Sequence, residues 1–108
     1  MADEPKLEPA IKAVLDATNR GDHKGFVAAF AKSGAINDWG SMFAGRSEIG
    51  RWDKEHNTGV QSQLRVTGVS RLGGEILVLL DVTGGGHNGS ATWSFRLAGP
   101  KVSSLEIG

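Results

Sequence analysis

The sequence predicts an α+β domain in which three N-terminal helices pack on one face of a curved antiparallel or mixed sheet. Two observations support this class. Residues 7–57 contain three segments with helical spacing of apolar side chains and one short strand-like segment. Residues 60–107 contain four stretches rich in Val, Ile, Leu and Thr, and the turns between them are too short for crossover helices. The 108 residues show no repeat or linker, so we expect one domain spanning residues 1–108.

The first two predicted helices meet at the segment NRGD, residues 19–22. Helical spacing in the first helix is carried by Leu7, Ile11, Val14, Leu15 and Thr18. Gly21 can end this helix in the left-handed conformation, and Asp22 can cap the next one. The second helix is expected to present Phe26, Val27 and Phe30 on one face and to end at KSG, before a short strand at 35–38.

The third predicted helix begins near Arg46 or Ser47 and is closed by Asn57 and Gly59. Its apolar face carries Ile49, Trp52 and His56 at helical spacing. The segment between the short strand and this helix is interpreted as a glycine-bounded link.

The last four segments are predicted strands, and their alternation assigns their faces. In 91–97, the side chains Ala91, Trp93, Phe95 and Leu97 share one face, which should meet the helices. The strand 75–82 is apolar on both faces, so both faces should be covered. We therefore expect a homodimer through the outer face of the sheet.

Composition excludes several classes of function. The 12 Lys and Arg residues balance the 12 Asp and Glu residues and show no cluster along the chain, which argues against a nucleic-acid surface. Cysteine is absent, and the three histidines lack the spacing of a metal site, so no metal or other cofactor is expected. The longest apolar run, ILVLL, is too short to cross a membrane. The first ten residues are acidic and polar, unlike a signal peptide, so a cytoplasmic location is expected.

The large aromatic side chains allow two interpretations. Five of them could converge between the helices and the sheet: Trp39, Phe43, Trp52, Trp93 and Phe95. They could simply fill a core. Alternatively, they line a pocket for a small hydrophobic molecule, with a few polar groups among them.

Three segments of the chain resemble a known family. These are NRGDHKGFVAAFAKSGAIND at 19–38, GRSEIGRW at 45–52 and GGGHNGSATWSFRLAGPKVSSLEI at 84–107. In order and spacing they resemble the nuclear transport factor 2-like superfamily, in its SnoaL-like and ketosteroid isomerase-like branch. The resemblance runs from about Leu7 to Ile107. It implies a cone-shaped sheet around three helices, a central apolar cavity and frequent dimerisation.

The resemblance also implies a role for Asp38. In steroid isomerases of this family, the general base is an aspartate on the strand after the second helix, and this position falls on Asp38. Burial in an apolar cavity disfavours the charged form of a carboxylate and suits it to proton transfer near neutral pH. The family's oxyanion donors, a tyrosine and a second acid, fall on Val14 and Trp93, so both are missing and steroid isomerisation by that mechanism is disfavoured.

Other side chains are candidates for a supporting role. His56 could reach Asp38 as an acid–base partner, or it could only end its helix. Asp81 is expected to face outward, and His87 is expected to face either solvent or the pocket rim.

Two hypotheses about function follow. The first is acid–base catalysis on a small hydrophobic molecule, of the isomerase, cyclase, dehydratase or epoxide hydrolase type, with Asp38 as base. The second is a non-catalytic ligand-binding or dimerisation module.

Overall fold

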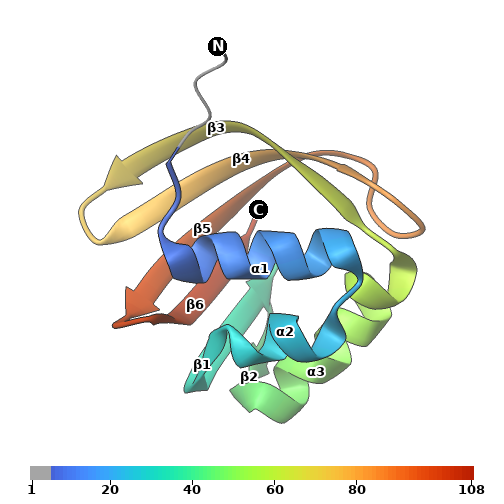
Figure 1. Ribbon diagram of the computed structural model, residues 1–108, viewed down its shortest axis with the longest axis horizontal. Coiled ribbons are helices and arrows are strands. Elements are labelled where there is room, and N and C mark those ends of the chain that lie inside the picture. The colour runs from blue at the N-terminus through green and yellow to red at the C-terminus, as the bar shows by residue number, and fades with distance from the viewer. Residues whose placement is uncertain (1–5) are drawn as a thin grey trace.

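The computed structural model describes residues 6–108 and confirms the α+β class (Figure 1). Its helices are α1 (Pro9–Arg20), α2 (His23–Ala28) and α3 (Gly45–His56), followed by a short 3-10 turn, η1 (Thr58–Val60). Its strands are β1 (Phe30–Asp38), β2 (Ser41–Ala44), β3 (Gln63–Leu72), β4 (Glu75–Thr83), β5 (Gly89–Ala98) and β6 (Lys101–Ile107).

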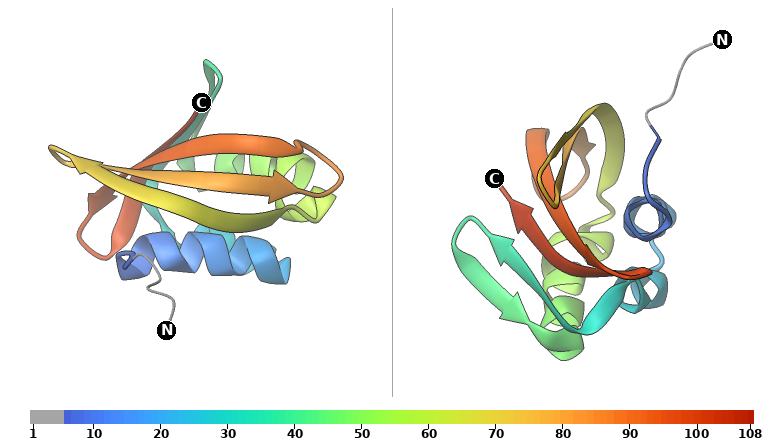
Figure 2. Two further views of the ribbon diagram at one scale, coloured as in Figure 1. Left: turned by 90° about the horizontal axis from the view of Figure 1, so that it is seen from above. Right: turned by 90° about the vertical axis from the view of Figure 1, so that its left-hand side faces the viewer.

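The strands form one mixed sheet in the order β2-β1-β6-β5-β4-β3. All neighbours are antiparallel except β1 and β6, which are parallel. The sheet curves, so that β3 and β4 arch over α1, while α3 packs on β1 and β2 (Figures 1 and 2). Within residues 6–108, no helix is long and apolar enough to cross a membrane.

The junction of α1 and α2 forms as the sequence predicts. Gly21 has φ +70°, and its N–H bonds the carbonyl of Thr18. This left-handed conformation carries little cost for glycine. The carboxylate of Asp22 accepts a hydrogen bond from the N–H of Gly25 at 2.9 Å and caps α2.

The segment after α2 differs from the prediction. α2 ends at Ala28, so Phe30 starts β1 instead of extending the helix. The reason is a distant pairing, because Phe30 lies opposite Val102 of β6. The expected link at 41–44 is the strand β2, which pairs antiparallel with the end of β1. Trp39 and Gly40 join the two strands with φ +51° and +95°, as in a type I′ turn.

The register of β4 and β5 fixes which side chains face the helices. Val78 lies opposite Trp93, and both are buried. Leu79 points to the outer face and is 43% exposed. Asp81 also faces outward, as expected, and forms an ion pair with Arg65. The odd positions of β4 therefore form the outer face.

A chain of aromatic rings links the helices to the sheet. Phe26 contacts Phe30 and Trp52 with ring centroids 5.3 and 5.8 Å apart. Trp52 meets Trp93 edge-on at 6.1 Å, and Trp93 contacts Phe95 at 6.4 Å. These rings join α2, α3 and β5 into one core, and offset or edge-on pairs of this kind are favourable.

Candidate functional site

A pocket of about 230 Å³ lies where α3, the end of β1 and the turn between β4 and β5 meet. Of the predicted site residues, it brings together Asp38, Trp39, Trp52, His56 and Trp93. Trp52 and Trp93 are 3% and 4% exposed and form its apolar wall.

Asp38 is the carboxylate of this pocket. Strand alternation places it on the same face of β1 as Ile36, which is fully buried. Asp38 itself is half-buried, and its Oδ2 accepts a hydrogen bond from Nε1 of Trp52 at 2.9 Å. The neighbouring turn is capped by Asn37, whose Oδ1 accepts from the N–H of Gly40 at 2.8 Å. The carboxylate of Asp38 is thus directed into the pocket instead of toward its own loop.

The two histidines of the pocket lie at its rim. The side chain of His56 is 53% exposed, its ring lies 6.3 Å from that of Trp52, and its Nε2 is 3.9 Å from Glu55. Among the hydrogen bonds of residues 6–108, none joins His56 to Asp38. His87 is exposed in the glycine-rich turn, and its Nε2 lies 3.1 Å from the carbonyl oxygen of Ser90.

Three predicted ligand contacts lie outside the pocket lining. Val14 and Phe95 are fully buried in the core between the helices and the sheet. Phe43 is buried on β2, where the guanidinium of Arg51 lies 5.0 Å from its ring centre. Trp39 does line the pocket, but it is 78% exposed because the hairpin turn directs it outward.

The structure adds polar groups that the sequence did not single out. Asn57, Ser62 and Ser90 also line the pocket. Ser62 is buried and shares the parity of Leu64, so strand alternation could have marked it. Ser90 pairs with Asp81, whose side chain faces outward, so the Ser90 side chain lies on the outer face of β5 and the residue only borders the pocket.

A second polar cluster links α2 to α3. His23 is half-buried, and its Nδ1 lies 2.8 Å from Oδ2 of Asp53. Asp53 is fully buried and also accepts hydrogen bonds from Asn57 at 2.9 Å and from the hydroxyl of Thr58. Asn57 in turn donates to Thr18 of α1 at 2.9 Å. Since every buried polar side chain here has a partner, the cluster ties the helices together.

Metal binding has no support in the described part of the chain. Within residues 6–108, no three His, Cys, Asp or Glu side chains lie close enough together to hold an ion.

Comparisons with known proteins identify the fold. No family model and no curated protein matches the chain. Solved structures do match. A proposed polyketide cyclase from Sinorhizobium meliloti superimposes with a TM-score of 0.81 at 23% identity, over 94% of this chain and 95% of that one. A nuclear transport factor 2-like protein of unknown function from Cytophaga hutchinsonii gives a TM-score of 0.80 at 12% identity, over 100% and 93%.

A third structure has a ligand. It is a protein with a ketosteroid isomerase-like fold from Catenulispora acidiphila, in complex with trimethylamine, with a TM-score of 0.76 at 17% identity over 95% and 86% of the two chains. The chain therefore has the nuclear transport factor 2-like fold, in the form shared by ketosteroid isomerase-like and polyketide cyclase-like proteins.

Proposed function

We propose that this protein binds a compact, largely apolar small molecule in the pocket beside Trp52, with the carboxylate of Asp38 as its polar anchor. The observation that carries this proposal is the hydrogen bond from Trp52 Nε1 to Asp38. It holds a half-buried carboxylate against an apolar wall, and small-molecule sites combine apolar walls with a few directed polar groups in this way.

The size of the pocket favours a small ligand. Its volume of about 230 Å³ is below the range of about 300–1,000 Å³ typical of sites for drug-sized molecules. Trp52 and Trp93 occupy much of the space between α3 and the sheet. The trimethylamine bound by the similar structure from Catenulispora acidiphila is a ligand of this compact kind.

Catalysis would use the same groups. In that case Asp38 takes a proton from one atom of the bound molecule, and His56 at the rim, in its protonated form, donates its own proton to another atom. Exchange with solvent then removes the proton from Asp38 and restores the one on His56. The positions for which the resemblance implies oxyanion donors carry Val14 and Trp93. The hydroxyl of Ser62 would have to stabilise the developing negative charge. We rank ligand binding above catalysis, because this donor set is weaker than the one implied by the resemblance.

The test uses Asp38→Asn, with Asp81→Asn as the matched control on the outer face. Binding of a panel of compact enones, epoxides and trimethylamine is followed by tryptophan fluorescence, and turnover is followed by product analysis. We expect Asp38→Asn to weaken binding by about tenfold, since a charge-assisted contact is lost, and the control to leave it unchanged. Loss of turnover by Asp38→Asn at ligand concentrations that saturate the variant would support Asp38 as the base. Equal affinity of Asp38→Asn and the wild type would refute the proposal.

We also propose that two copies of the chain associate through the outer face of the sheet. Trp39, Met42 and Leu79 are 78%, 57% and 43% exposed. Trp39 and Leu79 border one shallow depression on that face, and clustered exposed apolar side chains often mark an interface. The mass in solution, measured by light scattering, tests this. We expect a dimer that Leu79→Arg converts to a monomer, and a monomeric wild type would refute the proposed dimer.

The cytoplasmic location stays a prediction from the sequence.

A further inference from the structure

A groove larger than the pocket of Asp38 lies elsewhere on the described part of the chain. It has a volume of about 620 Å³ on the outer side of α2 and α3, and it shares no lining residue with the central pocket. Both helices contribute to its lining, which includes His23, Lys24 and Val27 of α2 and Arg46, Gly50 and Lys54 of α3.

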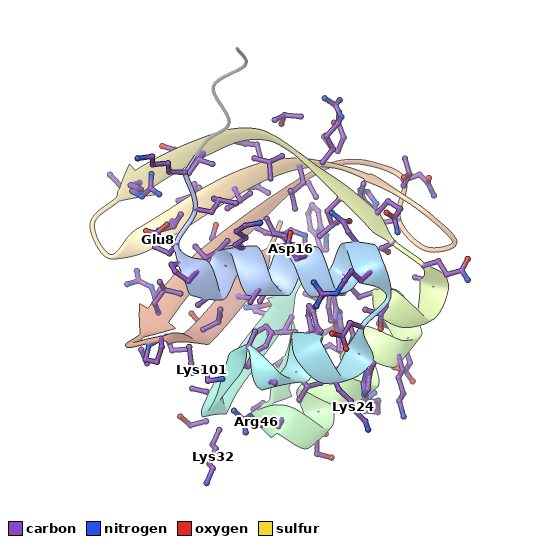
Figure 3. All side chains as sticks on the ribbon, viewed as in Figure 1. Glu8, Asp16, Lys24, Lys32, Arg46 and Lys101 are labelled. Atoms are coloured by element: carbon purple, nitrogen blue, oxygen red, sulfur yellow. The ribbon has the colours of Figure 1, made fainter. Side chains whose placement is uncertain are left out.

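Positive charge gathers in this groove without matching carboxylates. Within residues 6–108, Lys24, Arg46 and Lys54 have no carboxylate within ion-pair distance. Elsewhere, Arg65 and Arg71 each pair with an acid. Figure 3 shows Lys24 and Arg46 at the same end of the molecule, together with Lys32 and Lys101. In a chain with a formal net charge of zero, this groove therefore holds three cations without a carboxylate partner.

Arg46 is fixed in place at the edge of the groove. Its Nε and Nη2 donate to the carbonyl oxygen of Phe30 at 3.1 and 2.7 Å. These bonds leave Nη1 available to a ligand. Arg51 also borders the groove, but its charge is shared with Glu48 and Glu55 at 3.6 and 3.4 Å.

His23 adds an oriented imidazole. Its Nδ1 faces the buried carboxylate of Asp53 at 2.8 Å, so Nδ1 carries the hydrogen of that bond. Its Nε2 lies next to Gly50, because a Cβ built on Gly50 would sit 3.7 Å from it. A carboxylate that holds one imidazole nitrogen fixes the direction of the other.

The floor of the groove can accommodate an organic group. Val27 and the bare backbone of Gly50 form it, and the Cγ2 of Val27 would be 3.7 Å from a Cβ at Gly50. These are ordinary contact distances, so an alanine at position 50 fits but occupies space that a ligand would use.

From this arrangement we propose that the groove binds the phosphate monoester of a small organic molecule. A phosphate monoester carries about 1.5–2 negative charges at neutral pH and three acceptor oxygens. Lys24, Arg46 and Lys54 supply the opposite charge, and Nε2 of His23 can accept a hydrogen bond from a protonated phosphate oxygen. The organic group lies on Val27 and Gly50. A groove that lies between α2 and α3 and has an apolar floor fits a compact molecule better than an extended nucleic-acid backbone.

The test is a titration of the intact chain with phenyl phosphate, followed by the backbone amide signals in NMR spectra. We expect shifts at Lys24, Gly50 and Lys54, with the indole signals of Trp52 and Trp93 unchanged. The double variant Lys24→Gln/Lys54→Gln should weaken binding by about tenfold, since two charged contacts are lost.

The control variant is Lys6→Gln/Arg96→Gln, which removes the same charge from two exposed cations outside the groove. It should bind phenyl phosphate as the wild type does. Gly50→Ala should weaken phenyl phosphate more than inorganic phosphate, because it fills only the floor. Equal loss in both double variants would overturn the proposal, and so would shifts outside the groove. Tighter binding of a duplex oligonucleotide than of phenyl phosphate would also overturn it.

Discussion

Replacing Asp53 with alanine should destabilise the fold far more than replacing a surface acid. Asp53 is fully buried in α3, and four donors point at its carboxylate. They are Nδ1 of His23 at 2.8 Å, Nδ2 of Asn57 at 2.9 Å, the N–H of Thr58 at 3.3 Å and the hydroxyl of Thr58. The substitution removes all four bonds at once.

The size of the effect follows from what each donor can do afterwards. Asn57 keeps its bond to Thr18 at 2.9 Å, and the side chain of His23 is 34% exposed and can be hydrated. Thr58 is only 8% exposed and loses both of its bonds to the carboxylate. An unsatisfied buried polar group costs about 1–3 kcal/mol, and breaking a buried pair costs about 3–5 kcal/mol. We therefore expect a loss of about 4 kcal/mol in the free energy of unfolding.

Urea unfolding followed by tryptophan fluorescence measures this loss by linear extrapolation. The control is Asp81→Ala, which breaks an exposed ion pair with Arg65, the two side chains being 47% and 75% exposed. Such pairs contribute less than about 1 kcal/mol. The reasoning is refuted if Asp53→Ala costs no more than Asp81→Ala at an unchanged m-value.

Three further predictions concern the turn, a glycine and an ion pair. Trp39→Asn should leave the free energy of unfolding within about 1 kcal/mol of the wild type. Trp39 is 78% exposed, and relief of its left-handed backbone, worth about 1–2 kcal/mol, offsets the lost contact area. Gly59→Ala should cost about 2 kcal/mol or more in urea unfolding, because the added methyl group would overlap the carbonyl of Lys54. The hydrogen bond and charge of Arg71 lower the pKa of Glu8 in the folded state. The pair therefore stabilises the fold at pH values above the pKa of Glu8 in the unfolded chain. This stabilisation is lost as the pH falls through the lowered pKa of the folded state. Arg71→Gln should return the pKa of Glu8 toward its usual range in an NMR titration.

Local signals in the sequence predicted much of the fold. Gly21 and Asp22 mark the junction of α1 and α2, and the structure confirms both caps. The alternation of Trp93 and Phe95 assigns the inner face of β5, where both are buried. These features depend on residues within a few positions of each other, so periodicity and turn chemistry are sufficient to find them.

Features that depend on distant pairing were harder to predict. Phe30 has the spacing of a helical residue, but pairing with Val102 of β6 places it in β1. Trp39 was expected among the pocket aromatics, and the turn conformation leaves most of it in solvent. In both cases a contact or a backbone conformation set by the β-pairing outweighs the local pattern.

The sequence by itself determined the α+β class, the helix caps and the inner faces of the last strands. The role of Asp38 as candidate general base came from the family resemblance. Only the tertiary structure decided that Trp52 donates to Asp38, that His56 stays at the rim and that Lys24, Arg46 and Lys54 share one groove. The physical reason is that these groups lie on different elements. Whether their side chains meet depends on how the helices pack on the sheet and on strand register, which no short segment of the chain encodes.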